Sequence, residues 1–167
     1  MFLDESIIWH VLTQILLGLN YLNKNGIVYR NLQSKNIFLS KFRLMKITNF
    51  NNCYINNKNI TPINSLITIS SYTAPEILNN KKYNYKCDIW SVGCITYEMA
   101  TLSLPFMGKS ATLYNNIINN RRIKPIPNFY SKNMHTIINS LLIIDPSERP
   151  SINMLLNFPD IKENIKN

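Results

Sequence analysis

The first strong pattern of apolar positions lies between residues 5 and 25. Leucine and isoleucine recur there every three or four residues, which predicts an amphipathic helix. Asp4 and Glu5 favour its start, because acidic side chains are stabilised near the positive end of the helix dipole. Asn25 and Gly26 favour its end, since both residue types accept the left-handed backbone that terminates many helices.

After this helix the pattern changes to short apolar runs typical of strands, at Ile27–Tyr29, Ile37–Leu39 and Leu44–Ile47. Residues 51–70 are polar, rich in asparagine and without periodicity, which predicts a long loop. From Pro75 onward we expect helices at 88–100, 110–119, 131–143 and 151–157, separated by prolines. Aromatic residues such as Trp9, Tyr21 and Phe50 are expected in the core. No repeat or break divides the chain, so we expect one domain over residues 1–167.

Composition narrows the class of protein. Of the 167 residues 46% are hydrophobic, enough for a globular core, but no stretch approaches the ~20 apolar residues of a membrane helix. The N-terminus lacks the basic region of a signal peptide, and the three cysteines show no metal-binding spacing. We therefore expect an intracellular protein without a membrane partner, in the cytoplasm or the nucleus.

Charge is less informative than the distribution of the acids. The net charge of +9 comes from scattered lysines and arginines without a basic stripe, which argues against a nucleic-acid partner. Between Glu5 and Glu76 there is no Asp or Glu. That segment therefore has no carboxylate that could act as a general base or as a metal ligand.

Several ordered motifs carry the candidate chemistry. Two loops read YRNLQSKN (29–36) and NFN (49–51), followed by APE (74–76), CDIWSVGC (87–94) and DPSERP (145–150). This order resembles the C-terminal lobe of a eukaryotic protein kinase, most closely the NIMA-related (Nek) serine/threonine kinases. The resemblance implies an α+β, mostly α-helical fold. It divides into a catalytic-loop region (27–50), an activation segment (49–76) and a helical subdomain (77–160).

The resemblance places neutral side chains at the catalytic positions. Asn31 stands where the family has its catalytic base, and Gln33 where it has the loop lysine. Asn49 stands at the metal-binding Asp of the second loop, whereas Asn36 keeps the family's second metal ligand. An amide cannot accept a proton at neutral pH, and it is a weak Mg²⁺ ligand. Phe38 would line the floor of the adenine site.

The scaffold positions keep their family identities. Glu76 and Arg149 match a buried ion pair, and Asp88 matches a residue that accepts hydrogen bonds from the catalytic-loop backbone. Trp90 would pack beside them, and Phe50 would fill the regulatory hydrophobic column.

One serine and one arginine leave an alternative open. Ser65 falls near the position that is phosphorylated in active Nek-type loops, where Arg30 would pair with the phosphate. An ordinary loop serine explains Ser65 equally well.

Three hypotheses remain. The first is a pseudokinase, a catalytically impaired protein-interaction or scaffold module that uses no cofactor. The second is an active serine/threonine kinase with atypical motifs, which would need ATP and Mg²⁺. The third is a truncated relic. Residue 1 stands at the start of the first C-lobe helix, so we expect the N-lobe to be missing and a protein partner or a separate N-lobe to bind.

Overall fold

The structure is a computed structural model that describes residues 2–55, 69–108, 112, 115–117 and 123–166. Its helices are α1 (Glu5–Lys24), α2 (Pro75–Leu78), α3 (Lys86–Thr101), α5 (Lys132–Leu141), α6 (Ile152–Leu156) and α7 (Pro159–Lys166). The strands are β1 (Ile27–Val28), β2 (Ile37–Leu39), β3 (Met45–Ile47) and β4 (Tyr54–Ile55). The predicted α+β, mostly helical class is confirmed.

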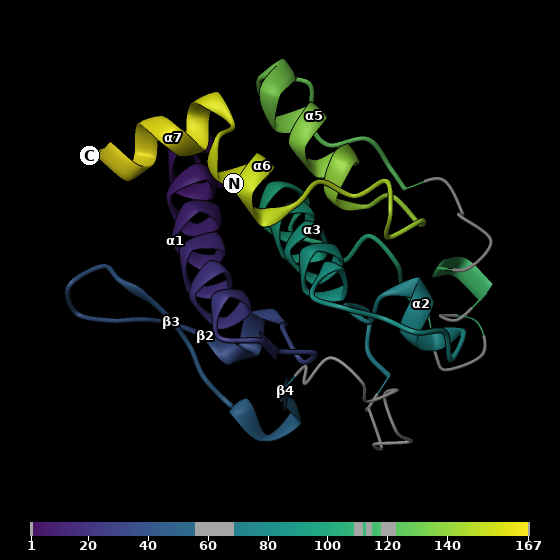
Figure 1. The fold of residues 1–167 in the computed structure, drawn as a ribbon. Helices are drawn as coiled ribbons and strands as arrows, with labels where there is room; N and C mark the ends of the chain where they lie inside the picture. Colours follow the sequence, from purple (N-terminus) through teal and green to yellow (C-terminus); the bar gives the residue numbers. More distant parts are fainter. Residues whose placement is uncertain (1, 56–68, 109–111, 113–114, 118–122, 167) are drawn as a thin grey trace.

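Helix α1 begins and ends where the sequence predicts. Asp4 is its N-cap, Asn25 its C-cap, and Gly26 adopts a φ of 70°. Most apolar positions of α1 are buried, with Ile7 and Leu17 exposed, and the helix contacts α3, α6 and α7 (Figure 1). Its periodic face therefore supplies one side of the core.

Helix α3 lies between α1 and α5 (Figure 1) and is apolar on nearly all sides. Trp90, Ile89 and Val92 are fully buried, although they point in different directions around the helix. A helix that is apolar all round is expected at the centre of a domain rather than at its surface. Gly93 of α3 lies directly against Leu141 and Leu142, at the end of α5.

Gly93 is expected to be intolerant of any side chain, whereas Gly18 of α1 accepts one. A Cβ on Gly93 would lie 2.8 Å from Leu141 Cβ and 2.9 Å from Leu142 Cδ2. At Gly18 the nearest atom is Ile47 Cδ1 at 3.2 Å, the mobile end of a side chain. We expect Gly93→Ala to cost about 1–3 kcal/mol of overpacking, which exceeds or offsets its gain in helix propensity.

Gly18→Ala, the matched variant, gains about 1 kcal/mol of helix propensity without that clash and is expected to be neutral or stabilising. Urea unfolding of both variants tests this difference. A Gly93→Ala protein as stable as Gly18→Ala would contradict the packing argument.

The four strands bring two loops face to face. Antiparallel β2 and β3 pair Ile37 with Ile47, and antiparallel β1 and β4 pair Val28 with Tyr54. One loop connects β1 to β2 and the other connects β3 to β4. The pairing of β1 with β4 holds the start of the first loop beside the end of the second, and the pairing of β2 with β3 holds the end of the first beside the start of the second.

Some sequence predictions differ from the structure. The expected 51–70 loop contains β4 at its start, because Tyr54–Ile55 pairs with β1. Tyr21 and Phe50 are 69% and 49% exposed, so only Trp9 of the three expected core aromatics is buried. The helix expected at 110–119 falls mostly outside the described residues, of which 112 and 115–117 are helical. Within the described part of the chain, no helix combines the length and apolarity needed to cross a membrane.

Candidate active site

Asp88 anchors the first loop to the central helix α3. Its carboxylate accepts hydrogen bonds from the backbone N–H groups of Tyr29 (2.9 Å) and Arg30 (2.8 Å), as the resemblance implies. Arg30 adopts a φ of 66°, so its backbone turns sharply where the loop begins. Burial raises the pKa of Asp88 to about 6, while the two N–H groups and the charge of Arg30 lower it.

Asn36 connects the two loops. Its side-chain N–H donates to the backbone oxygen of Asn31 at 2.9 Å, and its side-chain oxygen accepts from the Asn49 amide at 3.4 Å. The backbone oxygen of Asn36 accepts from the N–H of Thr48 (2.9 Å) and from its hydroxyl (3.2 Å). The residue is only 4% exposed. Asn36 therefore makes contacts with both loops through its side chain and its backbone.

The two other predicted catalytic positions are paired with each other. The Gln33 amide donates to Asn31 Oδ1 at 2.7 Å, so the oxygen at the base position already accepts a hydrogen bond. Both side chains are partly exposed at the loop surface. Neither group carries a charge, and neither takes up a proton near neutral pH.

The hydroxyl of Tyr29 contacts the backbone of the second loop. This hydroxyl donates to the backbone oxygen of Thr48 and lies 3.3 Å from that of Asn49. Phe50 meets the Tyr29 ring edge-on, with centroids 5.4 Å apart, and its place in a hydrophobic column stays a prediction. Asn49 itself adopts a left-handed backbone with φ 62°. Burial raises the pKa of Tyr29 to about 12, so its hydroxyl remains a donor.

Arg30 is engaged by neighbouring side chains and backbone. Its Nε donates to the backbone oxygen of Asn52 at 2.6 Å, and Nη1 donates to the Tyr83 hydroxyl at 2.9 Å. Its guanidinium also lies over the ring of Tyr54. Ser65 lies outside the described residues, so its pairing with Arg30 stays a prediction.

The scaffold ion pair is fully formed. Arg149 and Glu76 make a bidentate pair with both distances at 2.7 Å, and both residues are buried. Arg149 also lies over the Trp90 ring, 5.2 Å from its centroid, and Trp90 stacks on Phe106. These contacts tie α2 to α3 and to the segment before α6.

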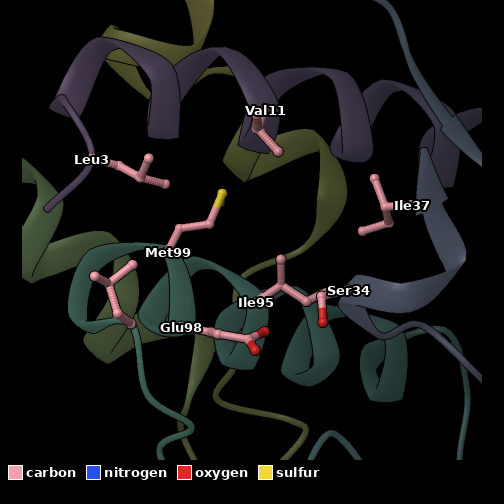
Figure 2. A pocket seen from close by; sticks show the side chains of 8 residues that line it. Leu3, Val11, Ser34, Ile37, Ile95, Glu98 and Met99 are labelled. Atoms are coloured by element: carbon pink, nitrogen blue, oxygen red, sulfur yellow. The ribbon is translucent and has the colours of Figure 1, made fainter. Parts of the chain in front are cut away.

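A pocket of about 390 Å³ lies between α1 and α3, beside the first loop. Figure 2 shows Val11 and Ile37 on one side of it and Ile95, Glu98 and Met99 of α3 on the other. Ile37 lines this pocket, whereas Phe38, the residue expected at the adenine floor, is 57% exposed on the other face of β2. The predicted role of Phe38 is therefore not supported by this pocket and stays untested.

Sequence reasoning missed a chain of polar contacts at the pocket rim. The Tyr72 hydroxyl donates to Glu98 at 2.7 Å and lies 2.8 Å from the Ser34 hydroxyl. These residues come from the first loop, the segment before α2 and α3, and no local spacing links them.

The donor set at the two loops does not fit a magnesium ion. Mg²⁺ prefers anionic oxygen ligands in octahedral geometry, but Asn31, Asn36 and Asn49 offer only amide groups, which bond one another or the loop backbone. Asp88 uses both carboxylate oxygens for backbone N–H groups. Across the described ranges, no cluster of three or more His, Cys, Asp or Glu residues is suited to a metal ion.

Sequence comparison gives the family. The protein kinase domain family matches residues 1–160. The chain belongs to the protein kinase domain family. The kinase domain is 34% identical over 99% of its length to the probable serine/threonine-protein kinase nek2 of Dictyostelium discoideum. It is 34% identical to mouse Nek4 and 36% identical to human Nek5, over 98% and 93% of its length.

These relatives confirm the Nek-like serine/threonine kinase resemblance. The kinase domain spans 40% of the length of nek2, 21% of Nek4 and 22% of Nek5. The matches establish its ancestry and its family. The roles of its individual site residues remain predictions.

Proposed function

We propose that this Nek-like kinase domain does not transfer phosphate and serves as a protein-interaction module. The observation that carries the proposal is the neutral amide of Asn31 at the position of the catalytic base. A positioned general base contributes about 10²–10⁴ in rate, and an amide contributes none of it. Gln33 and Asn49 remove two further charges from the same site.

The retained scaffold supports a folded module rather than a decayed chain. Glu76, Arg149 and Asp88 keep their buried partners, although the acidic groups of the neighbouring loops are gone. A buried ion pair with one partner removed is strongly destabilising, so both members must persist together in a folded protein. Loss of chemistry with retention of fold is the pattern expected of a binding domain.

Exposed apolar side chains supply a surface for a protein partner. Phe38 and Leu39 of β2 are exposed, as are Phe42 and Leu44 of the turn that connects β2 to β3, and Phe42 reaches 72% exposure. The pocket between α1 and α3 is also open and mostly apolar. Exposed apolar side chains beside an open apolar pocket are the kind of surface that a protein partner covers.

A phosphate-transfer assay tests this function. The purified 167-residue chain is incubated with radiolabelled ATP, casein, and MgCl₂ or MnCl₂, beside an active Nek-type kinase as positive control. We expect incorporation no higher than that of the Asn31→Ala variant. Transfer above this level that disappears in Asn36→Ala would overturn the proposal in favour of an active kinase.

The active kinase is the second candidate, and the retained Asn36 is the observation that favours it. An unfolding measurement distinguishes the relic hypothesis from the interaction module, because a relic is expected to unfold in a broad, non-cooperative transition. A single cooperative transition together with absent transfer is the result expected for the interaction module.

A further inference from the structure

We propose that the side-chain amides of Asn31, Gln33, Asn36 and Asn49 form an amide clasp, which joins the two loops directly where a kinase site would need a metal ion. The proposal deepens the proposed function and rests on it in one respect, the absence of phosphate transfer at this site. It assigns a structural role to residues that the family pattern places in catalysis.

Asn36 is the centre of the amide clasp. A buried side-chain amide must satisfy both its donor and its acceptor, and Asn36 does so with one partner in each loop. It donates to the backbone of Asn31 in the first loop and accepts from Asn49 in the second. Gln33 then closes the first loop by donating to the side chain of Asn31.

The amide of Asn49 can make this cross-link, and a carboxylate at the same position cannot. Each amide carries a donor and an acceptor, so neighbouring amides bond to one another without net charge. A carboxylate at position 49 would have no N–H to donate to Asn36, whereas one at position 31 would keep the acceptor contacts of Asn31. Two carboxylates would also repel one another, and a cation between them would be needed to hold the loops together. The change from acid to amide therefore replaces an ion-dependent contact with an ion-independent one.

Backbone contacts support the same cross-link. Thr48, just before Asn49, gives both its N–H and its hydroxyl to the backbone oxygen of Asn36. Tyr29, at the start of the first loop, donates its hydroxyl to the backbone oxygen of Thr48. The loops are thus bonded at the side chain and the backbone of one residue, Asn36.

The first test is thermal unfolding of the full chain with and without millimolar MgCl₂. We expect the midpoint of the wild-type protein to be unchanged by the salt, apart from the effect of matched ionic strength. The Asn36→Asp variant loses the donor to Asn31, and its midpoint should fall by about 3–6 °C. Asn153→Asp, an exposed site on α6, is the matched control and should change little.

The second test restores the acids. Asn31→Asp combined with Asn49→Asp should lower the midpoint in the absence of metal, and MgCl₂ should recover most of the loss. Binding of Mn²⁺, followed by electron paramagnetic resonance, should be absent in the wild type. This measurement remains decisive if the double variant does not fold.

Either of two results would overturn the amide clasp. One is a wild-type midpoint that rises with MgCl₂, or a bound Mn²⁺ signal that Asn36→Ala removes. The other is an Asn36→Asp protein as stable as Asn153→Asp. Phosphate transfer by the wild type would instead reject the proposed function, and the melting data would still decide the amide clasp separately.

Discussion

Replacing Glu76 with alanine is expected to lower the free energy of unfolding by about 3–5 kcal/mol, because it leaves the charge of Arg149 buried without its partner. Arg149 is among the largest fully buried side chains, and Glu76 accepts two of its N–H groups. Urea unfolding at neutral pH measures the loss. Glu163→Ala, an exposed glutamate on α7, is the control and should stay within about 0.5 kcal/mol of wild type.

The double variant Glu76→Ala with Arg149→Met separates the charge from the packing. It removes the unpaired charge, so its cost should be smaller than the sum of the two single losses. It does not restore wild-type stability, since Arg149 also donates to the backbone oxygens of Ile143, Ile144 and Lys86. If the Glu76→Ala variant unfolded at the same urea concentration as wild type, the ion pair would not be needed for the fold.

Helices α1 and α3 could be predicted from the sequence more reliably than the last helix. Helix α1 has apolar residues on one face and polar residues on the other, so its bounds follow from the pattern. Helix α3 starts at Lys86, two residues before the expected residue 88, and ends at Thr101, one residue after the expected end. The last helix, α7, was not predicted, since only Ile161 is buried in it.

Local motifs identified the candidate site, but the contacts within it depend on tertiary structure. The resemblance to the kinase family locates Asn31, Asn36 and Asn49 without any coordinates. The hydrogen bond from Asn49 to Asn36 crosses 13 positions, and that from Tyr72 to Glu98 crosses 26. Such pairs come together only when the strands and α3 are packed, and no periodic pattern in the chain encodes them.

After Glu76→Ala, the replacement of Asp88 by alanine is expected to have the largest effect on stability, because Asp88 anchors the first loop. Asp88→Ala leaves two backbone N–H groups, those of Tyr29 and Arg30, without an acceptor. Each unsatisfied buried donor costs about 1–3 kcal/mol, so we expect a total loss of about 2–6 kcal/mol. Urea unfolding at neutral pH measures it, and a loss below that of Gly93→Ala would contradict the anchoring role.

The pH dependence of Asp88 gives an independent check on its environment. Burial raises its pKa from the ordinary 3.8 to about 6, so the folded state holds an extra proton between these values. Its contribution to the free energy of unfolding is complete below pH 3.8 and is lost as the pH rises through 6. The stability of wild type relative to Asp88→Asn, which does not titrate, should therefore fall across this window and stay level above it. A relative stability that rises across it would mean that the Tyr29 and Arg30 N–H groups outweigh burial and hold the pKa below its ordinary value.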